Sequence, residues 1–217
     1  MIHFKNVTAT YLQGTGIRNF TLEVEKGSLI FLTGPTGAGK STILKCLYGI
    51  IPIQKGTLKL EGVDISRIGK KRVQLLRRKV GFIFQDYKLI PNRTVFENIS
   101  IVLRIKHLSG NRIQQKTRTI MKDLGLSHLE KRYPLELSSG EQQKVSIARA
   151  LVKDPLLMLA DEPTGNLDKD STNEMMTIFR HIADQGITLL MSTHDISAIK
   201  VEKDKVVTME NGERIIA

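Results

Sequence analysis

The feature that most constrains the fold is a glycine-rich turn between an apolar run and a helical pattern. Residues 31–49 read FLTGPTGAGKSTILKCLYG, in which Gly34, Gly39, Lys40 and Ser41 fit the pattern G-x-x-x-x-G-K-[ST]. Glycines let successive backbone N–H groups turn toward phosphate oxygens, and the following helix adds its positive dipole end. The segment therefore predicts a nucleoside triphosphate site rather than an ordinary strand-to-helix turn, with Lys40 reaching the β- and γ-phosphates and Ser41 binding Mg²⁺.

The apolar runs of the chain predict an α/β fold built on a P-loop NTPase core. SLIFLTG, KVGFIFQD, PLLMLADEP and GITLLMSTHD are each followed by a turn and a helical pattern, which is typical of buried strands in a mostly parallel sheet. Before them, MIHFKNVTATY and NFTLEVEKGS alternate apolar and polar residues, which predicts an N-terminal antiparallel β lobe. Residues 86–137 are helical in pattern, so we expect an inserted α-helical lobe within a single domain spanning residues 1–217.

Polar residues follow three of these predicted strands. Asp161 and Glu162 end the run PLLMLAD, and ligands of open parallel sheets bind at the carboxyl ends of strands. Asp161 is predicted to hold Mg²⁺ and Glu162 to orient or deprotonate an attacking water. Gln85 and His194 follow two other strands and should reach the same edge. The alternatives are a solvated strand end for the carboxylates and a structural role for the histidine.

A second segment is shaped for an anion. LSSGEQQKVSIARAL, residues 137–151, leads from small residues directly into a helix. One nucleotide does not need two phosphate-facing helix starts. The second start is explained if it serves a nucleotide bound to another copy of the chain.

With these motifs in this order, the sequence resembles the ATP-binding cassette (ABC) ATPases over essentially its whole length. The resemblance implies a Walker A loop at 34–42, a Q-loop at Gln85, a signature at 137–141, a D-loop at 166–168 and an adenine-stacking Tyr11. For Tyr11 the alternative is a packing role in a strand. The resemblance also implies catalytic roles for Glu162, His194 and Gln85, and Mg²⁺ contacts by Ser41, Gln85 and Asp161. The residues implied to contact ATP are Tyr11, Gly34, Pro35, Thr36, Gly37, Ala38, Gly39, Lys40, Ser41, Thr42, Ser138, Ser139, Gly140, Glu141 and Asp168.

The signature departs from the commonest form of the family. It reads LSSGE where LSGGQ is usual, so Ser139 stands in place of a glycine. If that position requires a positive φ, a serine there costs on the order of 1 kcal/mol and weakens closure of the dimer.

The stretch ADEPTGNLD resembles the branch of the family that serves bacterial cell division, lipoprotein release and macrolide export. Arg93, Thr94 and Val95 favour the cell-division members, and an exporter or lipoprotein-release ATPase is the alternative. The resemblance implies that two copies clamp two ATP·Mg²⁺ head to tail. It also implies a separate integral membrane partner of the cell-division type, which would hold the chain at the cytoplasmic face of the inner membrane.

The formal net charge of +11 allows either a nucleic acid or an anionic membrane surface as a partner. The densest basic run, RIGKKRVQLLRRK at 67–79, is interpreted as the solvated face of an amphipathic helix, with a membrane surface as the alternative. No zinc-finger, basic-zipper or RNA-binding aromatic pattern supports nucleic acid, so a soluble ABC ATPase acting on DNA or ribosomes is a remote alternative. No signal peptide or long apolar run is apparent, which predicts an intracellular protein, and Cys46 is expected to be a core residue.

Overall fold

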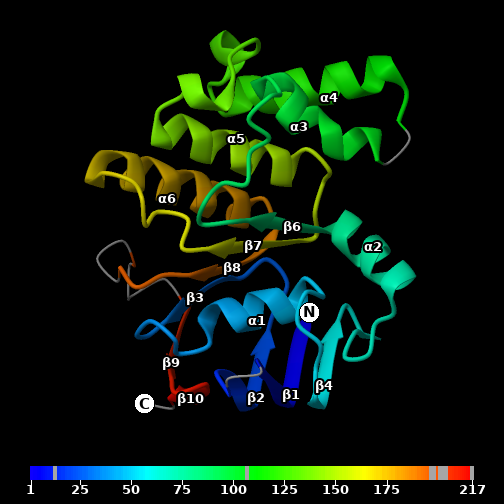
Figure 1. The fold of residues 1–217 in the computed structure, drawn as a ribbon, viewed down its shortest axis with the longest axis vertical. Coiled ribbons are helices and arrows are strands. Elements are labelled where there is room, and N and C mark those ends of the chain that lie inside the picture. Colours follow the sequence, from blue (N-terminus) through cyan, green and yellow to red (C-terminus); the bar gives the residue numbers. More distant parts are fainter. Residues whose placement is uncertain (12–13, 106–107, 196–198, 200–204, 216–217) are drawn as a thin grey trace.

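A computed structural model describes residues 1–11, 14–105, 108–195, 199 and 205–215. In this part of the chain, a six-stranded sheet with the order β10-β9-β3-β8-β7-β6 crosses the middle of the molecule (Figure 1). Neighbouring strands are parallel except for the edge strand β10, which confirms the predicted mostly parallel core. The strands are β3 (Leu29–Thr33), β6 (Val80–Ile83), β7 (Leu157–Asp161), β8 (Thr188–Ser192), β9 (Lys205–Glu210) and β10 (Glu213–Ile215).

The predicted N-terminal lobe is a second, antiparallel sheet with the order β2-β1-β4-β5. Its strands are β1 (Ile2–Thr10), β2 (Gly16–Val24), β4 (Lys55–Leu60) and β5 (Val63–Asp64). Helix α1 (Lys40–Leu47) packs between the two sheets, where Ile43, Leu44 and Leu47 are fully buried (Figure 1). Cys46 joins the same cluster, as expected, and burial raises the pKa of its thiol to about 12.

Helices α5 (Ser139–Leu151) and α6 (Lys169–Asp184) cover the opposite face of the central sheet. Along β3, Ile30 and Leu32 contribute to the cluster around α1, whereas Phe31 between them contributes to the cluster under α5 and α6. Because both faces of the strand are buried, its sequence is continuously apolar instead of alternating.

The segment between β6 and α5 is helical and lies at the end of the molecule away from β1 and β2 (Figure 1). It contains α3 (Val95–Arg104), α4 (Gly110–Asp123) and the 3₁₀ turns η1 (Ser127–Leu129) and η2 (Pro134–Glu136). The triplet at 93–95 has a structural role here. Thr94 caps α3 in a reciprocal capping box with Glu97, Arg93 pairs with the same Glu97 carboxylate at 3.1 Å, and Val95 is fully buried.

Helix α2 (Lys70–Lys79) lies at one edge of the molecule, just before β6. It buries Leu76 and partly buries Val73, while its basic residues lie mostly on the exposed side. The predicted amphipathic helix is therefore present. Across the described residues, none of the helices has the length and apolar character needed to cross a bilayer.

Candidate active site

The glycine loop is built at the carboxyl end of β3. Gly34 has φ 133°, and a Cβ there would lie 2.1 Å from the carbonyl oxygen of Met209, so no side chain fits. Gly39 has φ 100° and immediately precedes α1. No side chain caps this helix, and its first turn contains no acidic residue. Its first N–H groups are therefore left for an anion.

The loop forms one wall of a pocket of about 350 Å³. Tyr11, which is 44% exposed, lies at this pocket, and Gln85, Glu162 and His194 approach from the ends of other strands. The pocket is lined by Tyr11, Thr15, Gly16, Thr36, Gly37, Ala38, Gly39, Lys40, Ser41, Thr42, Gln85, Glu162 and His194. The structure thus brings together residues that the sequence places more than 180 positions apart.

Lys40 is buried within the loop that it follows. Its side chain is 6% exposed, and Nζ donates to the carbonyl oxygens of Gly34 at 2.7 Å and Pro35 at 3.1 Å. The ammonium also lies 3.8 Å from Oε1 of Glu162. These contacts hold the positive charge between the loop and the carboxylate, at the wall of the pocket.

Asp161 ends β7 and accepts two hydroxyl hydrogen bonds on Oδ1. Ser41 donates from Oγ at 2.7 Å, and Ser192 donates from Oγ at the same distance. Ser192 lies opposite Asp161 on the neighbouring strand β8 and is not among the predicted site residues. The only sequence signal for it is its position at the end of a buried strand.

Glu162 is held in an uncommon backbone conformation. Its φ is 47°, a left-handed value that costs a non-glycine residue roughly 1–2 kcal/mol. Its N–H donates to both the carbonyl and the hydroxyl oxygen of Ser192. Oε2 lies 2.7 Å from Nδ1 of His194 and accepts the His194 backbone N–H at 3.3 Å. The surrounding contacts therefore fix a largely buried carboxylate against an imidazole.

The sequence around this pocket matches a known family, since the family model described as ABC transporter matches residues 17–165. The chain belongs to this family. The ABC ATPase is 41% identical to the cell division ATP-binding protein FtsE of Streptococcus pneumoniae D39 over 98% of this chain and 93% of that protein. It is equally identical to FtsE of Escherichia coli K12, covering 96% of that protein, and the expected likeness to the cell-division branch is confirmed.

The fold is equally close to that of solved ABC cassettes. The dimeric post-hydrolysis structure of the cassette MJ0796 bound to ADP and Pi superposes with a TM-score of 0.90 at 30% identity, covering 100% of this chain and 97% of that one. CbiO1 of Clostridium perfringens, part of the transporter complex CbiONQ, also superposes with a TM-score of 0.90. Family and fold agree that this chain is an ATP hydrolase.

The predicted Q-loop is tied to helix α5, which begins within the predicted signature. Tyr87 and Lys88 both have left-handed backbones, with φ 57° and 49°. Arg149 on α5 donates to both carbonyl oxygens at 2.6 Å. Nearer the site, Asn166 donates from Nδ2 to the carbonyl oxygen of Gln85 at 3.3 Å. Neither contact is visible in the sequence pattern, and together they fix the loop that carries Gln85.

The signature residues do not line the pocket. Ser138 caps α5, and Glu141 accepts hydrogen bonds from its N–H and hydroxyl, which hold the pKa of Glu141 below its ordinary value. A Cβ on Gly140 would lie 3.4 Å from Oγ of Ser171, and Ser171 donates from its N–H and its hydroxyl to Asp168 at 2.8 Å. The signature and Asp168 thus form a second group of predicted residues, separate from the pocket.

Ser139 is the first residue of α5 and does not have a positive φ. The expected penalty for replacing the signature glycine with serine is conditional on a left-handed backbone, and that condition is not met. The serine therefore starts the helix without backbone strain.

Ser139→Gly should leave stability nearly unchanged or lower it slightly. Glycine costs a helix interior about 1 kcal/mol relative to alanine, and less in the first turn, so we expect a loss of about 0.5 kcal/mol or less. Urea unfolding of the two proteins measures the difference. A stabilisation of about 1 kcal/mol by glycine would show that the serine is strained after all.

Proposed function

We propose that this ABC ATPase is an FtsE-like subunit of a membrane complex, in which two copies of the chain clamp two ATP molecules head to tail. The similarity to FtsE proteins over nearly the full length of both chains carries this proposal. The separation between the pocket and the signature supports the head-to-tail arrangement, because each copy then offers the half-site that the other lacks. The dimeric cassette structures are consistent with it.

In the proposed complex, the loop N–H groups and Lys40 bind the phosphates, and Tyr11 stacks on the adenine. Ser138 to Glu141 and Asp168 of the second copy face the γ-phosphate from the opposite side. The capping box of α5 uses the N–H of Glu141, which leaves the N–H groups of Ser139 and Gly140 at this helix N-terminus to donate to a phosphate. The half-exposed ring of Tyr11 at the mouth of the pocket suits a base that is only partly enclosed.

The proposed metal is Mg²⁺. The hydroxyl of Ser41 and the carboxylate of Asp161 meet at 2.7 Å beside the phosphate loop, and Gln85 lines the same pocket. Hard oxygen donors with a single carboxylate, completed by water and phosphate oxygens, fit the coordination that Mg²⁺ prefers. When bound, the ion would neutralise charge on the phosphates.

Glu162 is proposed as the general base. Its carboxylate faces the pocket and would accept a proton from the attacking water, while Lys40 stabilises the phosphate charge. His194 holds one carboxylate oxygen at 2.7 Å and leaves Oε1 directed toward Lys40. Gln85 would position the attacking water and the metal on the side of the pocket that the second copy closes. The proposed role of Glu162 depends on the position of its carboxylate beside Lys40, which Glu162 adopts with a left-handed backbone.

The proposed partner is an FtsX-like integral membrane protein, through which ATP hydrolysis would act on cell-wall hydrolysis during division. This places the chain as a peripheral subunit on the cytoplasmic face of the inner membrane. The proposal includes contact of the basic segment 67–79 with an anionic membrane surface, and it includes no nucleic acid.

Co-purification tests the partner. We expect a tagged FtsX-like protein from the same genome, solubilised in mild detergent, to retain this chain in stoichiometric amounts. A lipoprotein-release permease from that genome, tagged in the same way, should retain little. Quantitative immunoblotting of both eluates gives the ratio. Preferential retention by the permease would reject the FtsX-like partner and support the export alternative.

A further inference from the structure

Helix α2 carries several positive charges that make no contact with the rest of the described fold. Six of its ten residues are Lys or Arg and none is acidic. Arg77 alone among them contacts described residues, donating to the carbonyl oxygens of Tyr48 and Gly49 and lying 5.0 Å over the Tyr48 ring. The side chains of the remaining five are exposed and form no hydrogen bond or ion pair with any described residue. They are Lys70, Lys71, Arg72, Arg78 and Lys79.

Three of the six cations lie at the end of the helix where positive charge is unfavourable. Lys70, Lys71 and Arg72 occupy the first turn, at the positive end of the helix dipole, where acidic residues stabilise. Gly69 at the N-cap offers no side-chain acceptor to the free N–H groups. Arg77, Arg78 and Lys79 in the last turn are favourably placed, so the local cost falls on the first turn alone. Such a local cost is expected where a surface serves binding.

A groove with both aliphatic and polar lining lies beside these cations. It has a volume of about 580 Å³ between α2 and the loop after α1, with Ile50, Ile51 and Ile68 among its lining residues. Lys70 and Arg67 lie at the same groove. On the outer side of α2, Leu75 is 57% exposed within one helical turn of the cations at both ends. The surface therefore combines positive charge with exposed aliphatic side chains.

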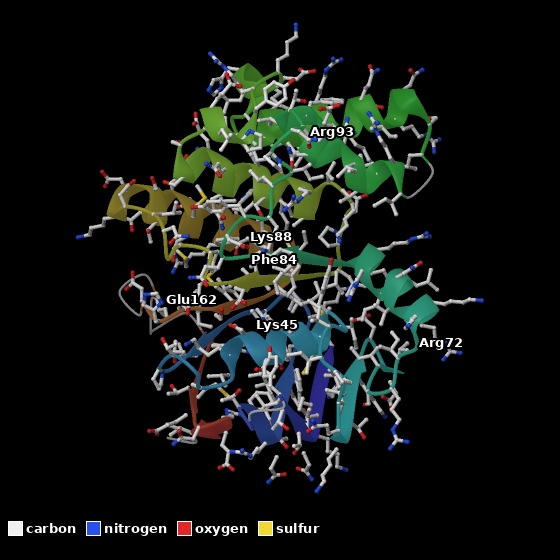
Figure 2. The ribbon with its side chains drawn as sticks, viewed as in Figure 1. Lys45, Arg72, Phe84, Lys88, Arg93 and Glu162 are labelled. Atoms are coloured by element: carbon white, nitrogen blue, oxygen red, sulfur yellow. The ribbon has the colours of Figure 1, made fainter. Side chains whose placement is uncertain are left out.

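We infer that α2 and this groove form a docking surface for anionic phospholipid headgroups. Cations around exposed aliphatic side chains are typical of helices that lie at a bilayer interface. Among the described residues lining the groove, no aromatic side chain is present on which a nucleic-acid base could stack. Arg72 and Glu162 lie on opposite sides of the molecule, so docking through α2 leaves the nucleotide pocket accessible (Figure 2). The inference deepens the proposed function, since it concerns how the ATPase meets the membrane.

Vesicle co-sedimentation of the full-length purified chain, without any membrane protein, tests the inference. Vesicles of phosphatidylcholine alone are compared with vesicles containing about 30% phosphatidylglycerol, at low and high salt. The test variant carries Lys71→Gln, Arg72→Gln, Arg78→Gln and Lys79→Gln, which leaves the fold contacts of Arg77 intact. The control has the same net charge and carries Lys26→Gln, Arg112→Gln, Lys122→Gln and Lys131→Gln at exposed positions elsewhere.

Each surface cation contributes roughly five-fold to binding of an anionic membrane. We therefore expect the wild-type chain to bind the anionic vesicles only, and the α2 variant to bind them at least about 30-fold more weakly. The control should lose much less. Equal loss of binding in both variants would show that only net charge matters. Equal binding of the wild-type chain to neutral and anionic vesicles would show that headgroup charge does not matter. Either result overturns the inference.

Two further measurements separate this inference from its rivals and from the proposed function. Strong binding of a DNA or RNA oligonucleotide, without vesicle binding, would assign α2 to nucleic acid instead. Unchanged vesicle binding by the α2 variant together with loss of the FtsX-like protein in co-purification would assign α2 to a protein partner. ATP hydrolysis is measured in the wild-type chain and in both variants. If the catalytic proposal is wrong, the wild-type chain will fail to hydrolyse ATP, whether or not it binds lipid.

Discussion

Glu162→Gln should lower ATP hydrolysis by at least about a hundred-fold while leaving ATP binding intact, since a positioned general base contributes roughly 10²–10⁴ to rate. Glutamine keeps the size of the side chain and can still hydrogen-bond His194, but it cannot accept the proton of the attacking water. Removing the negative charge 3.8 Å from Lys40 also leaves that ammonium freer to pair with phosphate. The variant should therefore accumulate as an ATP-bound dimer.

Phosphate release measures the rate, and sedimentation velocity with and without ATP measures the dimer. Glu213→Gln is a matched control, because it makes the same chemical change at an exposed residue of the edge strand β10. The control should hydrolyse ATP at the wild-type rate and should not show the additional dimer. Wild-type turnover by Glu162→Gln would remove this carboxylate from the role of base.

The parts of the site that can be predicted from sequence are those with local chemical signatures. The turn around Gly34 and Gly39 is identifiable because its backbone conformations exclude other residues, and Asp161 is identifiable because it ends an uninterrupted apolar run. The strands of the central sheet are predictable for the same reason, since burial on both faces leaves only apolar residues. Because those strands are parallel, the polar residues at their carboxyl ends can be placed at one edge of the sheet.

The parts that cannot be predicted from sequence depend on contacts between distant segments. Ser192 becomes a partner of Asp161 only because β8 is inserted next to β7 in register. Arg149 contacts the carbonyl oxygens of Tyr87 and Lys88 only after α5 has packed beside β6. Serine and arginine are common in helices and strand ends, so no pattern distinguishes these two. The conformation of Ser139 likewise requires the structure, because the glycine of the usual signature suggests a left-handed backbone that the chain does not adopt.

The second large effect is expected from mixing two inactive variants. Lys40→Ala removes the buried cation at the phosphate loop, so it should lose ATP itself, which calorimetry can measure. Gly140→Asp places a carboxylate at the start of α5, where the γ-phosphate of the other copy is proposed to bind. The new Cβ would lie 3.4 Å from Oγ of Ser171. Each variant should hydrolyse ATP at a small fraction of the wild-type rate, but through damage to opposite halves of the shared site.

In a mixed dimer, one composite site carries both defects and the other carries neither. Random exchange between equal amounts of the two variants gives about a quarter intact sites, so we expect phosphate release to rise toward a quarter of the wild-type rate. A Gly140→Asp and Gly140→Asp mixture, made with two different tags, is the matched control and should stay inactive. The rise should vanish at dilutions where sedimentation shows only monomers. If Gly140→Asp hydrolyses ATP normally at those dilutions, the signature does not act on the nucleotide of a second copy, and the head-to-tail dimer is the wrong mechanism for this chain.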